Sequence, residues 1–372
     1  MSRIDDLIAE HCPGGVEVKT LRELLGNIPR GRRLTKSNLA ADGSIPVFHG
    51  GLEPIGFHNR ANTPGKTVMI INTGASSGTV GWSEVAFWCS DGCFALPHSE
   101  AVLSRYLYYY AVANSKFLID RVRRAGIPTL AADVVLAMRI PVPPILVQRE
   151  IVEILDLFTQ LEAELEAELE ARRSQYEHYS RACLAFQDGV EWTTLGDVTE
   201  NHDRKRRPVT RSDRQGGEYP YYGANGVQDF VDGFIFDGTF LLIGEDGSVK
   251  RADGTPVLNW AVGKIWVNNH AHVLTSASER FNLRYLFHYL KTVDISALVS
   301  GGTQPKLNQR NLNQIPVPLV PREEQDRIVE ILDRFDALVN DLSVGLPAEL
   351  VARRKQYEYY RDKLLTFEEA AA

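Results

Sequence analysis

Apolar residues recur every three or four positions in two long stretches of the chain, a spacing typical of one face of an α-helix. The pattern predicts long helices over residues 148–186 and 319–367. We expect the two apolar stripes to pair with each other through Ile151, Leu155, Phe158, Leu161, Leu165, Leu169, Ile328, Leu332, Phe335 and Leu338.

The regions before these helices are rich in β-branched, aromatic and glycine residues, which indicates short strands separated by turns. The expected strands are Ile45–His49, Thr67–Asn72, Glu84–Cys89, Tyr219–Tyr222, Thr239–Ile243 and Ala261–Val267. A short aromatic helix follows in each region, around Leu103–Asn114 and Leu283–Thr292. The predicted fold class is therefore α/β (α+β).

The chain repeats itself with an offset of 174 to 181 residues. IVEILDLF (Ile151–Phe158) recurs as IVEILDRF (Ile328–Phe335), each after an extended IPVP joint, and ARRSQYEHY returns as ARRKQYEYY. A period this long indicates a duplicated domain, because solenoid repeats run to about 20–50 residues. We expect two tandem globular domains and two helical segments, at 16–140, 141–189, 190–314 and 315–367.

Each long helix carries an apolar stripe that no other helix of its own copy can cover. If the copies are related by a pseudo-two-fold axis, the stripe of the other copy covers it and the helices form an antiparallel coiled coil. The alternative is that each helix packs only on its own globular part. Gly345 and Pro347 predict a break in the second helix.

The first helix contains a finer repeat, LEAE-LEAE-LEAR (Leu161–Arg172). Four helical residues add about 400° of rotation and about 6 Å of rise, and one DNA base pair adds about 34–36° and about 3.4 Å. A helix that grows by such tetrads would turn two DNA-reading domains nearly in phase with the bases. Leu/Glu/Ala repeats also arise simply because these residues favour helix.

The 372-residue sequence shows neither a membrane-spanning segment nor a signal-like segment. No apolar run approaches the ~18 residues of a membrane span, and the start MSRIDDLIAEHCPGG has no signal-like apolar core, so we expect a cytoplasmic protein. The four cysteines form no CxxC pair. Cys89, Cys93 and His98 can be drawn as a partial metal site, but buried thiols explain them better, and we expect no metal.

The net charge of −7 is unevenly distributed. Residues 16–140 carry +5 and residues 190–314 are neutral, whereas the helical stretches 148–186 and 319–367 carry −5 and −2. The acidity therefore belongs to the helices, and the overall sign does not exclude nucleic acid as a partner of the globular parts.

Motifs of common enzymes are absent from the sequence. There is no GxxxxGK[ST], no GxGxxG between a strand and a helix, no GxSxG, no HExxH and no NPPY-type tetrapeptide. Glu245, Asp246 and Lys250 resemble a nuclease triad, but the usual spacing and a partner acidic strand are missing. The nuclease alternative predicts metal-dependent cleavage by the purified chain alone, and we expect none.

Polar loops suited to DNA occur in both copies. Arg and Lys neutralise phosphates or pair with guanine, and Asn and Gln bridge adenine. The predicted DNA-binding residues are Arg32, Arg33, Lys36, Asn59, Arg60, Ser76, Ser77, Arg204, Lys205, Arg206, Arg207, Asn225, Gln228, Glu245, Asp246, Ser248, Lys250, Gln304 and Lys306.

With these motifs in view, the chain resembles the specificity subunit of type I restriction–modification enzymes. The similarity covers residues 16–367 and is most specific in IPVP, IVEILD and AELVARRKQYEYYRDKLLTF. LLIGEDGSV and GGTQPKLNQRNLNQIPVP resemble the family's target-recognition domains. One departure is that the first copy has AGIPTLAADV where the second has GGTQPKLNQR. A contact made by Gln304 or Lys306 is therefore not assumed for the first copy.

The resemblance implies a non-catalytic, double-stranded DNA-binding protein that takes part in defence. Each target-recognition domain would read half of a split sequence, and the helices would set the spacer and dock two methyltransferase subunits. S-adenosylmethionine would bind the methyltransferases, and ATP and Mg would bind restriction subunits if these join, so that no cofactor is expected on this chain. The alternative is a stand-alone DNA-binding or scaffold protein of the same fold.

Overall fold

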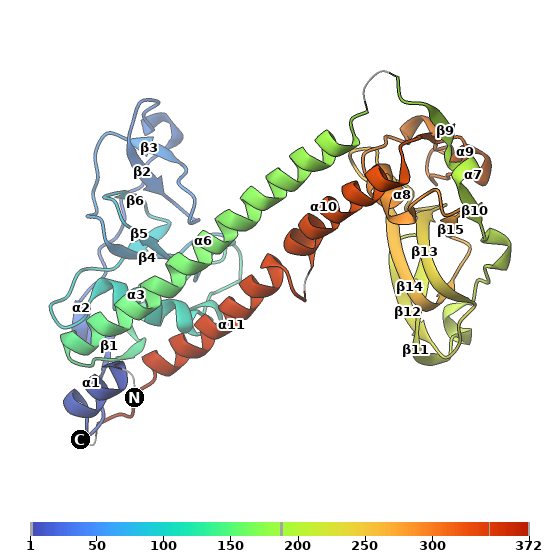
Figure 1. Cartoon of the computed structure of the whole chain (residues 1–372). Helices are drawn as coiled ribbons and strands as arrows, with labels where there is room; N and C mark the ends of the chain where they lie inside the picture. The colour runs from blue at the N-terminus through green and yellow to red at the C-terminus, as the bar shows by residue number, and fades with distance from the viewer. Residues whose placement is uncertain (1–2, 187–188, 342, 371–372) are drawn as a thin grey trace. The chain divides into compact units, whose positions relative to one another are not determined.

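The computed structural model describes residues 3–186, 189–341 and 343–370, and the side chain of Lys36, a predicted DNA contact, lies outside this description. The chain divides into two compact units. The first unit comprises Met1–Glu166 and Leu350–Ala372, and the second unit comprises Ala167–Glu349. Each unit contains a globular part and a portion of the long helices (Figure 1).

The two predicted long helices differ in their continuity. Helix α6 (Ile145–Leu184) is a single helix of 40 residues. The helix predicted over residues 319–367 is divided into two helices, α10 (Arg322–Asn340) and α11 (Leu346–Leu365). The predicted break is therefore confirmed. A Cβ atom on Gly345 would lie 2.4 Å from the carbonyl oxygen of Ala337, which explains why glycine occupies the break.

In the first unit, the start of α6 packs antiparallel against α11. The Phe158 ring stacks on Tyr360, with ring centroids 5.6 Å apart, and contacts Tyr357 at 6.2 Å. Further along α6, Glu162 accepts a 2.6 Å hydrogen bond from Nε of Arg354. The partner number falls as the α6 number rises, so the helices run in opposite directions.

In the second unit, the end of α6 packs in the same manner against α10. The Phe335 ring stacks on Tyr179 at 5.4 Å and contacts Tyr176 at 6.4 Å. Phe335 is the repeat counterpart of Phe158, and the two tyrosines are the counterparts of Tyr357 and Tyr360. The same contact is therefore made twice with the roles of the two copies exchanged, as antiparallel pairing of duplicated helices requires.

The stripe residues do more than pair helices. Ile151 and Leu155 are fully buried in the core of the first unit, together with residues of its globular part and with Leu364 and Leu365 of α11. Helix pairing and packing on the globular part therefore occur together. Leu161 and Leu338 were predicted to pair, but their side chains are 43% and 36% exposed.

The globular part of the first unit contains three small sheets: β1 with β8, β3-β2-β6 and β5-β4-β7. Helix α3 covers β4 and β5, and the main core lies between them. The elements are α1 (Arg3–His11), β1 (Val18–Thr20), α2 (Leu21–Leu25), η1 (Lys36–Asn38), β2 (Ile45–Phe48), β3 (Gly56–His58), β4 (Thr67–Ile71), β5 (Val80–Ser83), β6 (Trp88–Cys89), β7 (Cys93–Ala95), α3 (Ser104–Ala113), α4 (Ser115–Ile119), α5 (Ala132–Leu136) and β8 (Arg139–Pro141).

The globular part of the second unit is built on a six-stranded sheet of order β10-β15-β13-β14-β11-β12, with β9 paired to β16 beside it. Helix α8 packs on β13 and against α10. The elements are β9 (Trp192–Thr194), α7 (Leu195–Val198), β10 (Thr199–Asn201), η2 (Asp203–Lys205), η3 (Arg211–Asp213), β11 (Gly216–Gly223), β12 (Gly226–Val231), β13 (Phe236–Gly244), β14 (Leu258–Val267), β15 (Ala271–Ser276), α8 (Leu283–Leu290), η4 (Ser296–Leu298), α9 (Gln309–Asn313) and β16 (Pro316–Pro318).

Five of the six expected strands lie at their predicted places, and Glu84–Cys89 is mostly wrong. The strand before it, β5, was not predicted because it contains Gly81, and glycine is uncommon in strands. A Cβ on Gly81 would lie 2.4 Å from Leu52, so the glycine serves close packing on a strand face.

An ion pair joins the aromatic helix to the long helix in each unit. Arg105 contacts Asp156 at 2.7 Å in the first unit, and Arg284 contacts Asp333 at 2.7 Å in the second. A neighbouring side chain adds a second hydrogen bond to the carboxylate, and this side chain differs: it is Tyr109 in the first unit and His288 in the second.

This difference predicts that the second unit loses stability in acid. Burial lowers the pKa of His288 to about 4, although the hydrogen bond to Asp333 opposes the shift. An unfolded histidine has a pKa of about 6.5, so between these values the unfolded chain binds more protons than the folded one. Stability contributed by neutral His288 is therefore present above about pH 6.5 and is lost as the pH falls toward 4.

We predict that His288→Tyr, which installs the residue of the first unit, removes part of this pH dependence. Between pH 7 and pH 5, the free energy of unfolding should fall by roughly 2 kcal/mol less in the variant than in the wild type. Urea unfolding at both pH values measures the difference. The exposed His178→Tyr is the control and should follow the wild type. Equal pH dependence in all three proteins would contradict the prediction.

Candidate nucleic-acid interface

Three polar loops of the second unit meet around strand β15. The loop 202–207 follows β10, the turn 244–250 follows β13, and the segment 300–308 precedes α9. These are the segments in which the sequence places most of the predicted DNA-binding residues of the second copy. The structure therefore brings together residues that are about 100 positions apart in the chain.

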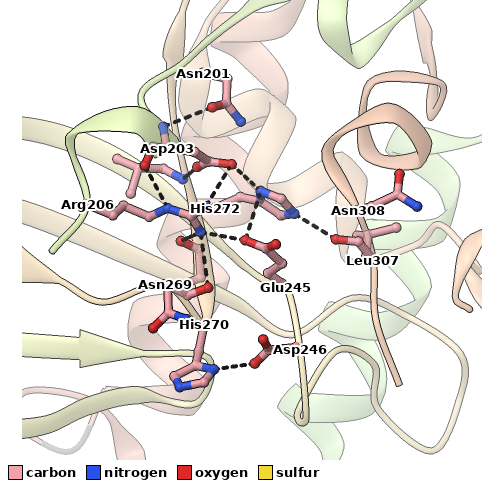
Figure 2. A network of polar contacts seen from close by, with 12 residues as sticks. Asn201, Asp203, Arg206, Glu245, Asp246, Asn269, His270, His272, Leu307 and Asn308 are labelled. Atoms are coloured by element: carbon pink, nitrogen blue, oxygen red, sulfur yellow. Dashed lines mark hydrogen bonds and ion pairs between the residues drawn. The ribbon is translucent and has the colours of Figure 1, made fainter. Parts of the chain in front are cut away.

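A buried ion-pair network joins the first two loops (Figure 2). The Arg206 guanidinium donates to the Glu245 carboxylate at 2.6 Å and lies 3.4 Å from the Asp203 carboxylate. It also donates to the carbonyl oxygen of Ala271 at 2.8 Å. Arg206 and Glu245 were predicted to contact DNA, but their side chains are 12% and 14% exposed and are bound within the protein. In the described structure they position the loops.

His272 extends the network to the third loop. Its Nε2 donates to the carbonyl oxygen of Leu307 at 2.8 Å, and its Nδ1 lies 2.5 Å from the Asp203 carboxylate. Burial would raise the pKa of Asp203, but the hydrogen bond and charge of His272, the Val273 backbone N–H and Arg206 lower it below its usual value. Asp203 is therefore held as a carboxylate that links loop 202–207 to β15.

Asp203, Glu245 and His272 also place their ligand atoms within 4.8 Å of one another, the only such group found among the described residues. The Arg206 guanidinium already contacts both carboxylates. These residues therefore have the partners of a structural ion-pair cluster.

The residues of the nuclease alternative have separate partners. Glu245 contacts Arg206, Asp246 contacts His270, and Lys250 donates to Ser296 at 3.0 Å. The three side chains are thus used in three different local contacts.

Backbone hydrogen bonds join the segment 300–308 to the turn 244–250 in the second unit, and they join the corresponding segments around Pro128 and Gly74 in the first unit. In the second unit, the Leu307 N–H donates to the Glu245 carbonyl at 2.8 Å, and the Gly247 N–H donates to the Pro305 carbonyl at 3.0 Å. In the first unit, the Leu130 N–H donates to the Asn72 carbonyl at 2.8 Å. There the Gly74 N–H donates to the Pro128 carbonyl at 3.0 Å.

The divergent segment AGIPTLAADV thus follows the same backbone path as GGTQPKLNQR but presents different side chains. Thr129 of the first unit corresponds to Lys306, whose ammonium lies 3.5 Å from Glu245 in the second. Ser77, a predicted DNA contact, is buried and donates to the carbonyls of Gly74 and Pro128. Its neighbour Ser76 is partly exposed.

A tryptophan missed by the sequence reasoning holds an arginine segment in each unit. The Trp88 indole N–H donates to the Arg32 carbonyl at 2.7 Å, and the Trp266 indole N–H donates to the Arg207 carbonyl at 2.6 Å. Each tryptophan lies on a strand that pairs in parallel with the strand after the arginine segment. The matching positions of Trp88 and Trp266 in the two copies were the signal that could have revealed this contact.

The remaining predicted residues divide by exposure and contact. Asn225 donates to Ser248 at 2.7 Å, and Gln228 accepts from Asn268 at 3.4 Å. The exposed cationic or amide side chains are Arg32, Arg33, Asn59, Arg60, Arg204, Lys205, Arg207, Asn225, Gln228, Lys250, Gln304 and Lys306.

In the first unit, Arg32 and Arg60 line one cavity together with Arg30, His58 and Trp88. The sequence does not indicate this cavity, because its walls come from four separate segments of the chain.

A duplicated domain with matched loop backbones and different loop side chains is the arrangement expected of a repeated recognition module. Comparison with protein families agrees. The model described as type I restriction modification DNA specificity domain matches residues 13–171 and 187–352. The chain belongs to this family of type I restriction–modification specificity subunits and contains two copies of its domain, which confirms the resemblance seen in the sequence.

Individual relatives carry corresponding names. A putative type I restriction enzyme specificity subunit of Haemophilus influenzae is 44% identical over 184 residues, or 48% of this chain and 47% of that protein. The EcoR124I/EcoR124II specificity subunit of Escherichia coli is 29% identical over 71% of each chain. The match to the Haemophilus protein thus spans about half of its length.

Solved structures share the fold. The S subunit of a type I restriction–modification system from M. genitalium is 19% identical, with a TM-score of 0.67 over 94% of this chain and 96% of that one. A chain from a study of complex assembly and conformational transition in a type I R-M system is 17% identical, with a TM-score of 0.54 over 95% and 98%. Of the helices in the described residues, none has the length and apolar character needed to cross a bilayer.

We predict that Arg206→Gln loosens the three loops of the second unit. The change leaves Glu245 and Asp203 without their guanidinium partner and should lower the free energy of unfolding by roughly 3 kcal/mol. Hydrogen exchange should also become faster in residues 244–248 and 300–307. Arg207→Gln, the same charge change at an exposed neighbour, is the control and should stay within about 0.5 kcal/mol of the wild type. Equal effects of the two variants would rule out the positioning role.

Proposed function

We propose that this chain is the sequence-reading, non-catalytic subunit of a type I restriction–modification complex. Each globular part reads one half of a bipartite target in double-stranded DNA. The helices set the spacer between the halves and dock two adenine-N6 methyltransferase subunits, which carry S-adenosylmethionine. Restriction subunits that use ATP and Mg complete the complex where they are present.

The observation that carries this proposal is the matched loop framework of the two units. Backbone hydrogen bonds at Asn72 and Leu130 repeat at Glu245 and Leu307 with the same distance of 2.8 Å. A common backbone supports docking on the regular phosphate backbone of DNA, and different side chains support reading of different bases. One domain used twice, with different loop side chains in each copy, would therefore read two different half-sites.

Exposed charge on these loops supports nucleic acid as the ligand. Arg204, Lys205 and Arg207 are exposed around the inward-facing Arg206. In the first unit, Arg32 and Arg60 are exposed beside Trp88. Such side chains can neutralise the phosphates that flank a groove of the DNA duplex. Amides such as that of Gln304 can hydrogen-bond to base edges within the groove.

The helical segments support the proposal of a protein partner. Leu157 and Tyr359 are 57% and 64% exposed on α6 and α11 of the first unit. Exposed aliphatic and aromatic side chains on these helices are available for contact with another protein. The exposed carboxylates of Glu164, Glu168 and Glu170 lie on α6 and disfavour contact of this helix with DNA phosphates.

The test is a map of DNA methylation. We expect that co-expression of this chain with the type I methyltransferase of the same genome, in a host without such systems, yields one bipartite motif methylated at N6 of adenine on both strands. Omission of the chain should abolish the motif. A soluble complex that methylates no motif would reject the proposal and favour a scaffold role or a stand-alone DNA-binding role.

A second prediction concerns the tetrads, which lie where the chain passes from the first unit to the second, between Glu166 and Ala167. Deletion of residues 165–168 shortens the helix by about 6 Å and turns it by about 400°, close to one full turn. The methylation map should keep both half-sites and change only the spacer. A changed half-site sequence would refute the role of the tetrads as a ruler.

A further inference from the structure

We propose that the cavity of the first unit is a binding site for a single unstacked nucleotide, with the chemistry of a nucleoside monophosphate. This inference goes beyond the proposed function, which concerns stacked base pairs in a duplex. The nucleotide can come from two sources, a free mononucleotide or a nucleotide displaced from a DNA strand, and the experiment below distinguishes them.

The cavity has the size of a small-molecule site. Its volume is about 980 Å³, and ligand pockets in proteins usually measure about 300–1,000 Å³. Its walls come from residues 29–32, 58, 60–64, 88–89 and 95–98 together with Thr67. A mononucleotide therefore fits without any opening of the fold.

The charge of the walls selects an anion. Arg30, Arg32 and Arg60 all line the cavity, and their side chains are exposed. No Asp or Glu occurs among the lining residues, all of which belong to the described part of the chain. The contrast with Arg206 of the second unit is informative, because two carboxylates neutralise that guanidinium within the protein. Guanidinium groups that line one cavity without carboxylates beside them suit a phosphate, which arginine can bind bidentately.

An aromatic wall selects a planar ring in addition to the anion. Trp88 and His58 both line the cavity, and their rings meet edge to face with centroids 4.9 Å apart. Leu96 and the prolines Pro64 and Pro97 add apolar surface to the wall, beside the polar side chains Asn62, Thr63, Thr67 and His98. Unpaired bases stack on such aromatic side chains, and base stacking combined with a basic groove is the usual chemistry of single-stranded nucleic-acid sites.

Internal hydrogen bonds hold this wall in place before any ligand arrives. The Trp88 indole N–H donates to the Arg32 carbonyl at 2.7 Å, which ties the ring to the arginine segment. The Asn62 side chain donates to the Cys89 carbonyl at 3.0 Å and accepts from the Cys89 N–H at 2.7 Å. The loop that carries Arg60 is thereby anchored to the strand that carries Trp88, and a preorganised site loses less entropy on binding.

The first arm of the test titrates the full-length chain with dAMP, deoxyadenosine and inorganic phosphate by calorimetry and tryptophan fluorescence. We expect saturable binding of dAMP, with each fragment at least about ten-fold weaker. Arg60→Gln should weaken dAMP binding by about ten-fold or more. Trp88→Phe should abolish the fluorescence change, and the matched Trp266→Phe should retain it.

Arg124→Gln is the charge-matched control, since Arg124 is exposed in the same unit and does not line the cavity. It should bind dAMP as the wild type does, and circular dichroism should show all variants folded. Absence of saturation by dAMP in the folded wild type overturns the proposal, and so does an equal loss in Arg124→Gln and Arg60→Gln.

The second arm identifies the source of the nucleotide. Duplexes of the mapped target carry 2-aminopurine at successive positions, and its emission changes where the base leaves the DNA stack for another environment. A change at one position that persists in Arg124→Gln and disappears in Arg60→Gln, at protein concentrations that saturate the duplex, identifies a displaced nucleotide. Binding of dAMP without such a change identifies a free nucleotide. Because the first arm needs no target, failure of the proposed function does not hide the outcome.

Discussion

The reciprocal contact between a phenylalanine and two tyrosines is the interaction on which the architecture depends. Phe158 packs on Tyr357 and Tyr360, and its counterpart Phe335 packs on the counterparts Tyr176 and Tyr179. Each contact joins a helix start from one copy to a helix end from the other. Neither copy can therefore complete its own core alone, since α11 supplies Leu364 and Leu365 to the first unit and α6 supplies Leu184 to the second.

The two globular parts share a loop backbone and differ in what stabilises it. In the second unit, Asp203, Arg206, Glu245 and His272 join three loops through buried ion pairs. In the first unit, the corresponding turn is closed by backbone and hydroxyl contacts such as that of Ser77, and the arginines remain open around a cavity. Gene duplication preserved the main-chain hydrogen bonds, which do not depend on side-chain identity, while the side chains diverged. This is the separation of framework from recognition that a specificity subunit needs.

Periodic features were predictable from the sequence, and features formed by distant segments were not. The three-to-four spacing of Ile151, Leu155 and Phe158 predicted α6 to within a few residues, and Gly345 predicted the break before α11. The inward turn of Arg206 was not predictable, because its partner Glu245 lies 39 positions away and nothing local distinguishes it from Arg207. The cavity of the first unit was not predictable for the same reason, because separate segments of the chain form its walls. The base contacts and the domain boundaries stay predictions.

A methylation map of an exchange variant tests most directly whether each copy reads its own half of the target. Residues 190–314 are replaced by the matching segment of a family member with a different target, and the variant is expressed with the same methyltransferase. We expect that one half of the motif changes while the other half and the spacer stay as they were. A motif in which both halves change, or neither does, would contradict this expectation.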